Sequence, residues 1–168
     1  HLRKQLRLQM LWHISIQKQY RTAKRTFELN VQFQSNAQRL VLYGPSGAGK
    51  TQVLKMLAGL VKPETGFIHF SNSVLFDRQQ SIHVPPQTRR LAYMFQDYAL
   101  FPWLTVRENI AFGPKSARRS RSEVRQISEY FIDMVGLRKF SDAYPHQLSG
   151  GMRQRVSIAR VLANDAEV

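Results

Sequence analysis

The residues most suited to chemistry lie in one short run, Gly44-Pro45-Ser46-Gly47-Ala48-Gly49-Lys50-Thr51. The run has the form G-x-x-x-x-G-K-[ST], whose glycines let backbone N–H groups turn inward and form a concave site for phosphate. The Lys50 ammonium is suited to the β- and γ-phosphates of a nucleotide. The Thr51 hydroxyl is suited to Mg²⁺, which takes its other ligands from phosphate oxygens and water. The run therefore predicts a nucleotide site.

The flanking sequence predicts the elements that position this loop. Residues 40–43 form a short apolar run typical of a buried strand, and apolar residues recur at helical spacing from Val53 to Val61. A strand, a loop and a helix in this order aim a helix N-terminus at phosphate. The alternative, a glycine-rich turn with a chance lysine, is disfavoured because the complete motif lies in the setting that it requires.

A second motif lies about a hundred residues downstream, at Leu148-Ser149-Gly150-Gly151-Met152-Arg153-Gln154-Arg155. Ser149 is typical of a helix N-cap, and the two glycines leave backbone N–H groups open to an anion. Taken alone, this turn is more simply an ordinary helix start. Together with the first motif it gives one chain two phosphate-seeking helix N-termini. This favours two chains packed head to tail, with the loop of one facing the serine-glycine turn of the other.

These motifs resemble those of the ATPase subunits of ATP-binding cassette (ABC) transporters. Residues 44–51 match the Walker A motif of that family, and residues 148–155 match its signature motif. The preceding segment 144–147 is also typical, and Gln96 within residues 93–97 matches the Q-loop. The resemblance is specific because three motifs occur in the right order at the right separations.

The resemblance implies ATP and Mg²⁺ as cofactors. It implies that Gln96 reaches the Mg²⁺ and the attacking water, and that Thr51 shares the metal. It also implies that the signature serine and glycines bind the γ-phosphate across a dimer. The nucleotide-binding residues that it implies are Gly44, Pro45, Ser46, Gly47, Ala48, Gly49, Lys50, Thr51, Ser149, Gly150 and Gly151. Met152 replaces the glutamine often found after the glycines, so a nucleotide contact through that side chain is lost.

Tyr20 is a further candidate for nucleotide binding. An aromatic side chain near this place stacks on adenine in the family, as any π-face can without hydrogen-bond readout. Residues 21–25 do not resemble the usual loop of the family. An ordinary surface tyrosine therefore remains the alternative.

The fold that the resemblance implies is α/β of the P-loop type, with a parallel core sheet, an antiparallel β-subdomain and a helical subdomain. Residues 1–9 form a basic N-terminal extension, and residues 10–168 a partial ABC ATPase domain whose helical subdomain spans about 97–155. Residues 13–16 and 27–33 alternate apolar and polar side chains, as half-buried antiparallel strands do. Residues 91–95 are predicted as a core strand ending at Gln96.

A helix is expected to begin after Ser120, because Ser120 and Glu123 have the spacing of a capping box. Farther along, the family continues from the signature helix into a strand that ends in the Walker B aspartate and glutamate. Asp165 and Glu167 are rejected as substitutes, because they lie before any such strand has formed. No histidine follows the signature. We therefore expect a fragment of a longer protein that binds ATP but hydrolyses it poorly.

The partners implied are a second ATPase subunit in a head-to-tail dimer and an integral membrane permease, at the cytoplasmic face of the cell membrane. Residues 97–106 are rich in aromatic side chains and suit an aromatic-anchored docking site for the permease. Within them, Leu100 and Phe101 are expected mostly in the core and Trp103 at the interface. The segments 95–102 and 108–113 are similar to importer ATPases of the molybdate and sulfate type.

Composition limits the alternatives. With no cysteine, the chain has neither disulfides nor thiolate metal sites, and no apolar run approaches the roughly 18 residues that span a membrane. The net charge of +14 could instead indicate an ABC ATPase that acts on nucleic acid or ribosomes. The charges are spread along the chain, which favours solvated basic faces near a membrane over a nucleic-acid groove.

Overall fold

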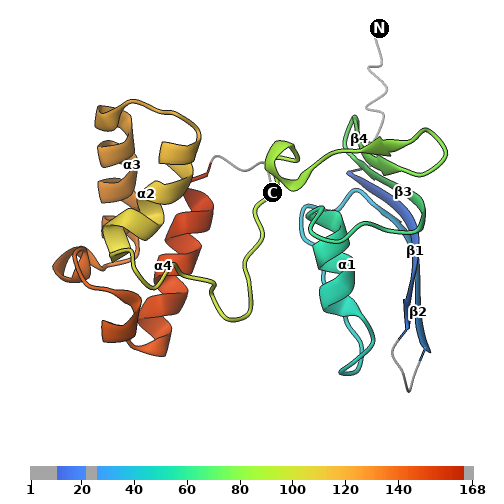
Figure 1. Ribbon diagram of the computed structural model, residues 1–168, viewed down its shortest axis with the longest axis horizontal. Helices are drawn as coiled ribbons and strands as arrows, with labels where there is room; N and C mark the ends of the chain where they lie inside the picture. Colours follow the sequence, from blue (N-terminus) through green and yellow to red (C-terminus); the bar gives the residue numbers. More distant parts are fainter. Residues whose placement is uncertain (1–10, 22–25, 165–168) are drawn as a thin grey trace, which may run out of the picture. The chain divides into compact units, whose positions relative to one another are not determined.

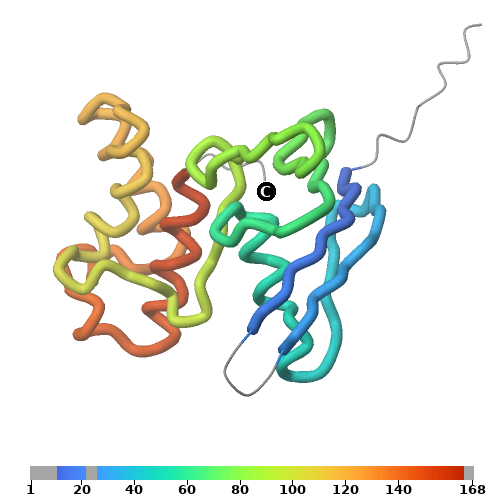
Figure 2. The backbone as a smooth tube through the Cα atoms, turned by 45° about the vertical axis from the view of Figure 1, so that its right-hand side comes forward, coloured from blue at the N-terminus to red at the C-terminus, as the bar shows by residue number. Residues whose placement is uncertain are grey.

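The computed structural model describes residues 11–21 and 26–164, which form two compact units divided between Arg89 and Arg90 (Figures 1 and 2). Each unit is built on its own set of buried side chains. The predicted extension 1–9, Asp165 and Glu167 lie outside the described residues.

The first unit is a β-sheet with one short helix beside it (Figure 1). Its five strands run in the order β2-β1-β3-β4-β5, and all neighbours are antiparallel. The two strands predicted around residues 13–16 and 27–33 are confirmed. The elements are β1 (Trp12–Arg21), β2 (Thr26–Ser35), α1 (Lys50–Leu57), β3 (Thr65–Phe70), β4 (Ser73–Asp77) and β5 (Ile82–His83).

The alternating pattern of β1 explains this sheet. Ile14 and Ile16 lie two residues apart, so both point to the same face, and both are fully buried together with Ile68 of β3. In α1, Val53 and Met56 are buried in the same way, three residues apart along the helix. The period of two in the strands and the period near four in the helix thus specify which faces form the core.

Two predicted strands are absent from the described residues. Residues 40–43 and 91–95 are irregular, and Val41 and Tyr43 are 85% and 100% exposed. A strand is stable only beside a hydrogen-bonded neighbour, and every strand in the described ranges pairs within the antiparallel sheet. The described chain therefore forms the antiparallel and helical parts of the predicted fold but not its parallel core sheet.

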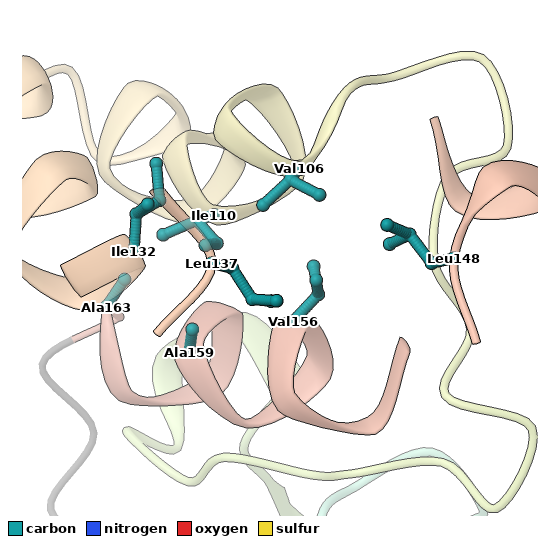
Figure 3. Packing of buried hydrophobic residues seen from close by; sticks show 8 residues of the cluster. All are labelled: Val106, Ile110, Ile132, Leu137, Leu148, Val156, Ala159 and Ala163. Carbon is teal, nitrogen blue, oxygen red and sulfur yellow. The ribbon is translucent and has the colours of Figure 1, made fainter. Parts of the chain in front are cut away.

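The second unit contains three helices, α2 (Val106–Ser116), α3 (Arg121–Met134) and α4 (Gly150–Leu162), with two short 3₁₀ turns, Arg138–Phe140 and Pro145–Gln147, between α3 and α4. Its core combines one side of each helix with the connecting segments (Figure 3). Small alanines on α4 let the helices approach closely, while branched aliphatic side chains fill the centre. The buried cluster comprises Val106, Ile110, Ile132, Leu137, Leu148, Val156, Ala159 and Ala163.

Two capping boxes fix where α2 and α3 begin. The Ser120 hydroxyl accepts from the N–H of Glu123, whose carboxylate accepts from Ser120 in return, as predicted. Thr105 and Glu108 repeat the arrangement at α2, where the Glu108 carboxylate accepts from both the N–H and the hydroxyl of Thr105. These hydrogen bonds lower the pKa of Glu108. Both helix starts are therefore specified by local sequence.

A buried amide organises the turn before α2. Asn109 is fully buried, and its Oδ1 accepts from the N–H of Phe101 at 2.9 Å. Its Nδ2 donates to the carbonyls of Phe101, Leu104 and Thr105 at 2.9–3.2 Å. This network holds a turn in which Phe101 is half-buried and Trp103 is 70% exposed.

Replacing Asn109 with alanine should lower the free energy of unfolding by about 3 kcal/mol, because buried backbone groups lose their partners. Urea unfolding followed by circular dichroism measures this loss. Ser116→Ala, which removes an exposed hydroxyl on the same helix, is the control and should cost less than about 0.5 kcal/mol. Equal effects of the two substitutions would contradict the role assigned to Asn109.

Candidate functional site

The loop 44–49 has a backbone that requires glycine. Gly47 and Gly49 have φ angles of 82° and 86°, in the left-handed region, and Gly49 is the N-cap of α1. Between them, the N–H of Ala48 donates to the carbonyl of Pro45 at 3.3 Å. The chain therefore curls tightly before it enters the helix.

This curl leaves backbone donors available. Within the described part of the chain, no acceptor lies opposite the N–H groups of Gly47, Gly49, Lys50 and Thr51. Consecutive N–H groups at the start of a helix form a concave site for an anion. The structure thus brings together the loop residues that the sequence predicted.

Lys50 folds back across the loop. Its ammonium donates to the carbonyls of Gly44 and Pro45, each at 2.7 Å. Because it is the first residue of α1, its charge lies beside the helix N-terminus. The ammonium and the free N–H groups therefore converge on one short segment.

The loop is held against the sheet by contact with β2. A Cβ added to Gly49 would lie 2.3 Å from Cδ1 of Leu29 and 3.2 Å from Cζ of Phe27. A side chain at position 49 would force Leu29 and Phe27 to shift, so glycine is favoured by packing as well as by its φ angle.

The other end of α1 is held by Arg89, a residue that the sequence motifs did not indicate. Its Nη1 donates to the carbonyls of Met56 at 2.9 Å and Leu57 at 2.7 Å, and its Nε donates to Val84 at 2.8 Å. Burial lowers the pKa of the Arg89 guanidinium to about 10. Arg89 therefore satisfies carbonyls that end a helix without intrahelical partners.

Tyr20 lies beside the start of α1. Its hydroxyl donates to Oε1 of Gln52 at 3.0 Å, and its ring lies 6.2 Å from that of Phe27. The Lys18 ammonium lies 5.5 Å from the centre of the Tyr20 ring. Burial, and secondarily the charge of Glu64, raise the pKa of Tyr20. The structure thus places this candidate close to the loop.

The signature segment begins α4. The Ser149 hydroxyl accepts from the N–H of Met152 at 3.3 Å, which makes it the N-cap as predicted. Gly150 and Gly151 are exposed, and a Cβ at either position would meet nothing within 4 Å. Met152 packs against the helical core. The helix N-terminus is therefore open on its glycine side.

Gln96 is exposed at the start of a turn that α4 holds in place. Tyr98 and Ala99 in this turn have positive φ angles of 63° and 42°. The Arg160 guanidinium donates to the carbonyls of Ala99 at 2.7 Å and Tyr98 at 2.9 Å, and Ser157 also donates to Tyr98. Burial lowers the pKa of Arg160. These contacts tie the Gln96 turn to the signature helix.

Sequence reasoning missed Arg160 and Ser157 as well as Arg89. The available signal was weak: Ser157 and Arg160 lie three residues apart, on one side of a predicted helix. Their partners are backbone carbonyls, and because every residue has one, the sequence does not indicate which carbonyl will accept a hydrogen bond.

The remaining site predictions divide between the two units. Thr51 and Tyr20 lie in the first unit, and Gln96 and the signature residues lie in the second. Among residues 11–21 and 26–164, no cluster of three or more histidine, aspartate or glutamate side chains is arranged to bind a metal ion. A metal site at Thr51 would thus take most of its ligands from elsewhere, as the chemistry of nucleotide-bound Mg²⁺ allows.

A family comparison defines the class of protein. Residues 28–168 match the family model described as "ABC transporter". The chain belongs to the ABC transporter family, and its described residues form part of the fold of a P-loop ATPase cassette.

Curated relatives are import ATP-binding proteins. The sulfate/thiosulfate import ATP-binding protein CysA of Mycobacterium bovis is 44% identical over 127 residues, which are 76% of this chain and 34% of the relative. The molybdenum import ATP-binding protein ModC of Paramagnetospirillum magneticum is 42% identical over 139 residues, 81% of this chain and 37% of the relative. The trehalose/maltose import ATP-binding protein MalK of Thermococcus litoralis is 39% identical over 147 residues, which are 88% of this chain and 39% of the relative. The chain thus spans about a third of the length of these relatives.

A solved structure gives the same classification. An ATP-binding cassette, determined as a dimer in a post-hydrolysis state bound to ADP and Pi, superposes with a TM-score of 0.71. The two sequences are 29% identical, and the match covers 92% of this chain and 69% of the chain in the solved structure.

None of the helices in the described ranges combines the length and apolar character needed to cross a membrane.

Gly49→Ala should lower the free energy of unfolding by about 2 kcal/mol, because a Cβ strains the left-handed backbone and overlaps Leu29. Gly150→Ala is the matched control, since its Cβ meets open space, and should change stability by less than about 0.5 kcal/mol. Parallel urea titrations of both variants measure the difference. Indistinguishable midpoints would contradict the packing described for the loop.

Proposed function

We propose that this chain is the nucleotide-binding part of an ABC importer ATPase and that residues 44–51 bind the phosphates of ATP. The observation that carries the proposal is the loop itself, in which four N–H groups at the start of α1 have no acceptor among the residues that the structure describes. Such a site attracts phosphate through hydrogen bonds and through the positive end of the helix.

Each loop residue then has a defined role. The Lys50 ammonium exchanges the carbonyls of Gly44 and Pro45 for the β- and γ-phosphates. Gly47 and Gly49 keep the N–H groups pointing inward, and Pro45, Ser46 and Ala48 complete the curve. The Tyr20 ring, beside Gln52, is the proposed surface for adenine.

The donor set also fits Mg²⁺. The Thr51 hydroxyl and the Gln96 amide oxygen are neutral oxygen ligands, which suit a cation that is otherwise bound by phosphate and water. When bound, Mg²⁺ would neutralise charge on the phosphates during transfer to water. The protein contributes chiefly position: Gln96 is presented by the turn that Arg160 and Ser157 hold.

We further propose that the signature residues act on the nucleotide of a second copy. Gly150 and Gly151 are exposed at a helix N-terminus and have room for a γ-phosphate, and Ser149 already orients the first turn. The loop and this turn lie in different units of one chain, and a head-to-tail dimer uses both. The solved cassette that resembles this chain is itself dimeric.

The proposed biological role is solute import through a membrane permease at the cytoplasmic face of the membrane, with Trp103 among the contacts. The resemblance to CysA and ModC supports an oxyanion of the sulfate or molybdate type. Relatives for trehalose/maltose and for spermidine/putrescine import match at 39% and 42% identity. Import is therefore the broader proposal and the oxyanion the narrower one.

Lys50→Ala should weaken ATP binding at least tenfold, because the loop loses its only cationic side chain. Titration with a fluorescent ATP analogue and Mg²⁺ measures the affinity. Lys55→Ala, on the same helix but outside the loop, is the control and should retain the wild-type affinity within twofold. Wild-type affinity in Lys50→Ala would overturn the assignment of the site.

Ser149→Arg should leave ATP binding by the monomer nearly intact and prevent formation of the ATP-bound dimer. The arginine adds bulk where the partner's γ-phosphate is proposed to lie, and Ser149 belongs to a different unit from residues 44–51. Analytical ultracentrifugation with ATP, beside the binding titration, separates the two effects. Equal loss of monomer binding would contradict the head-to-tail arrangement.

A further inference from the structure

A cavity lies in the helical unit between α2 and α3. Its accessible volume is about 290 Å³, enough for a small organic molecule. The floor is formed by Ala111 of α2 and by Val124 and Ser128 of α3, all of them buried. The Ser128 hydroxyl donates to the carbonyl of Val124 at 2.7 Å, so it offers the cavity no free donor. The floor therefore suits an apolar group.

The walls of this cavity are strongly basic. Three cations gather where the two helices connect: Lys115 in the last turn of α2, Arg119 in the connection and Arg121 at the start of α3. Arg107 and Arg125 lie farther along the helices. Against these five cations, the described residues of the wall include one carboxylate, that of Glu108.

Ion pairs neutralise one end of the cavity more than the other. Glu129 lies 3.6 Å from Arg107 and 3.0 Å from Arg125, and Asp142 lies 3.5 Å from Arg107. These two carboxylates therefore balance the charge at the end away from the helix connection.

The connecting end keeps an excess of positive charge. Arg119 pairs with Glu123 at 3.8 Å. Lys115 and Arg121 form no ion pair with any residue that the structure describes. The charge of Lys115 is the smallest of the causes that lower the pKa of Glu108, so the two groups interact only weakly. Lys115 and Arg121 are therefore the cations best placed to receive an anion.

We propose that this cavity binds a small phosphate monoester with an apolar body. The phosphate lies at the connecting end, between Lys115 and Arg121 and beside Arg119, and the apolar body covers Ala111 and Val124. A phosphate monoester fits better than a carboxylate, because it brings close to two negative charges and three acceptor oxygens to a cavity lined by several cationic side chains. The site differs from residues 44–51, which belong to the other unit.

Phenyl phosphate is the probe, and amide chemical shifts of the ¹⁵N-labelled protein report both affinity and location. Shifts should gather in residues 111–128, and the Lys115→Gln/Arg121→Gln double variant should weaken binding at least tenfold. The matched control is Arg78→Gln/Lys139→Gln, which removes the same charge from exposed positions outside the cavity. It should leave the dissociation constant within twofold of wild type.

The loop must be separated from the cavity, since both attract phosphate. The titration is therefore repeated in Lys50→Ala, where shifts in residues 111–128 should persist unchanged. Inorganic phosphate, which lacks the apolar body, should bind this region more weakly than phenyl phosphate. Shifts confined to residues 44–51, or equal weakening by the two double variants, would overturn the proposal.

A further arm identifies the source of the ligand. Cosedimentation with vesicles containing phosphatidic acid, compared with phosphatidylcholine alone, tests whether a lipid headgroup reaches the cavity. Binding that Lys115→Gln/Arg121→Gln abolishes would support a membrane source, and binding of phenyl phosphate alone would support a soluble one. Failure of both ligands to reach residues 111–128 would overturn the proposal.

Discussion

The contact between Gly49 and β2 is the constraint on which the shape of the loop 44–49 depends. Leu29 and Phe27 occupy the space that a Cβ would need, so any residue other than glycine would displace them. Because the same residue caps α1 in a left-handed conformation, one packing contact sets both the curvature of the loop and the direction of the helix. The sheet is thus the surface against which the loop takes its shape.

Two arginines, the buried Arg89 and the half-buried Arg160, serve as structural donors. Arg89 binds carbonyls at the end of α1, and Arg160 binds carbonyls in the turn after Gln96. The hydrogen bonds that the described residues give these two guanidinium groups go to backbone carbonyls, and burial lowers the pKa of both. An arginine can do this because its planar group carries five donors in fixed directions. Arg89 therefore holds the end of α1, the helix that follows the loop, and Arg160 holds the turn after Gln96.

Local sequence predicted the features that local sequence determines. The capping box at Ser120, the N-cap at Ser149 and the alternating strands β1 and β2 all follow from residues within a few positions of one another. The strands expected at 40–43 and 91–95 could not be judged in this way, because a strand needs hydrogen-bonded partners that its own sequence does not specify. The roles of Arg89 and Arg160 were not predicted for a related reason. Their partners are backbone carbonyls, which every residue has, so the residue types along the chain do not indicate the contact.

The two hydrogen bonds of Lys50 would make the proposed binding of phosphate an exchange of partners. The ammonium is already bound by the carbonyls of Gly44 and Pro45, so a phosphate that recruits it must compensate for both lost bonds. The measured affinity would then be a difference between two sets of contacts and smaller than the new contacts alone suggest. In return, the same bonds hold a long flexible side chain near the place where it is needed, which reduces the rotamer entropy still to be lost. Breaking the two hydrogen bonds would thus reduce the enthalpy gained on binding, while the ordered side chain would reduce the entropy lost.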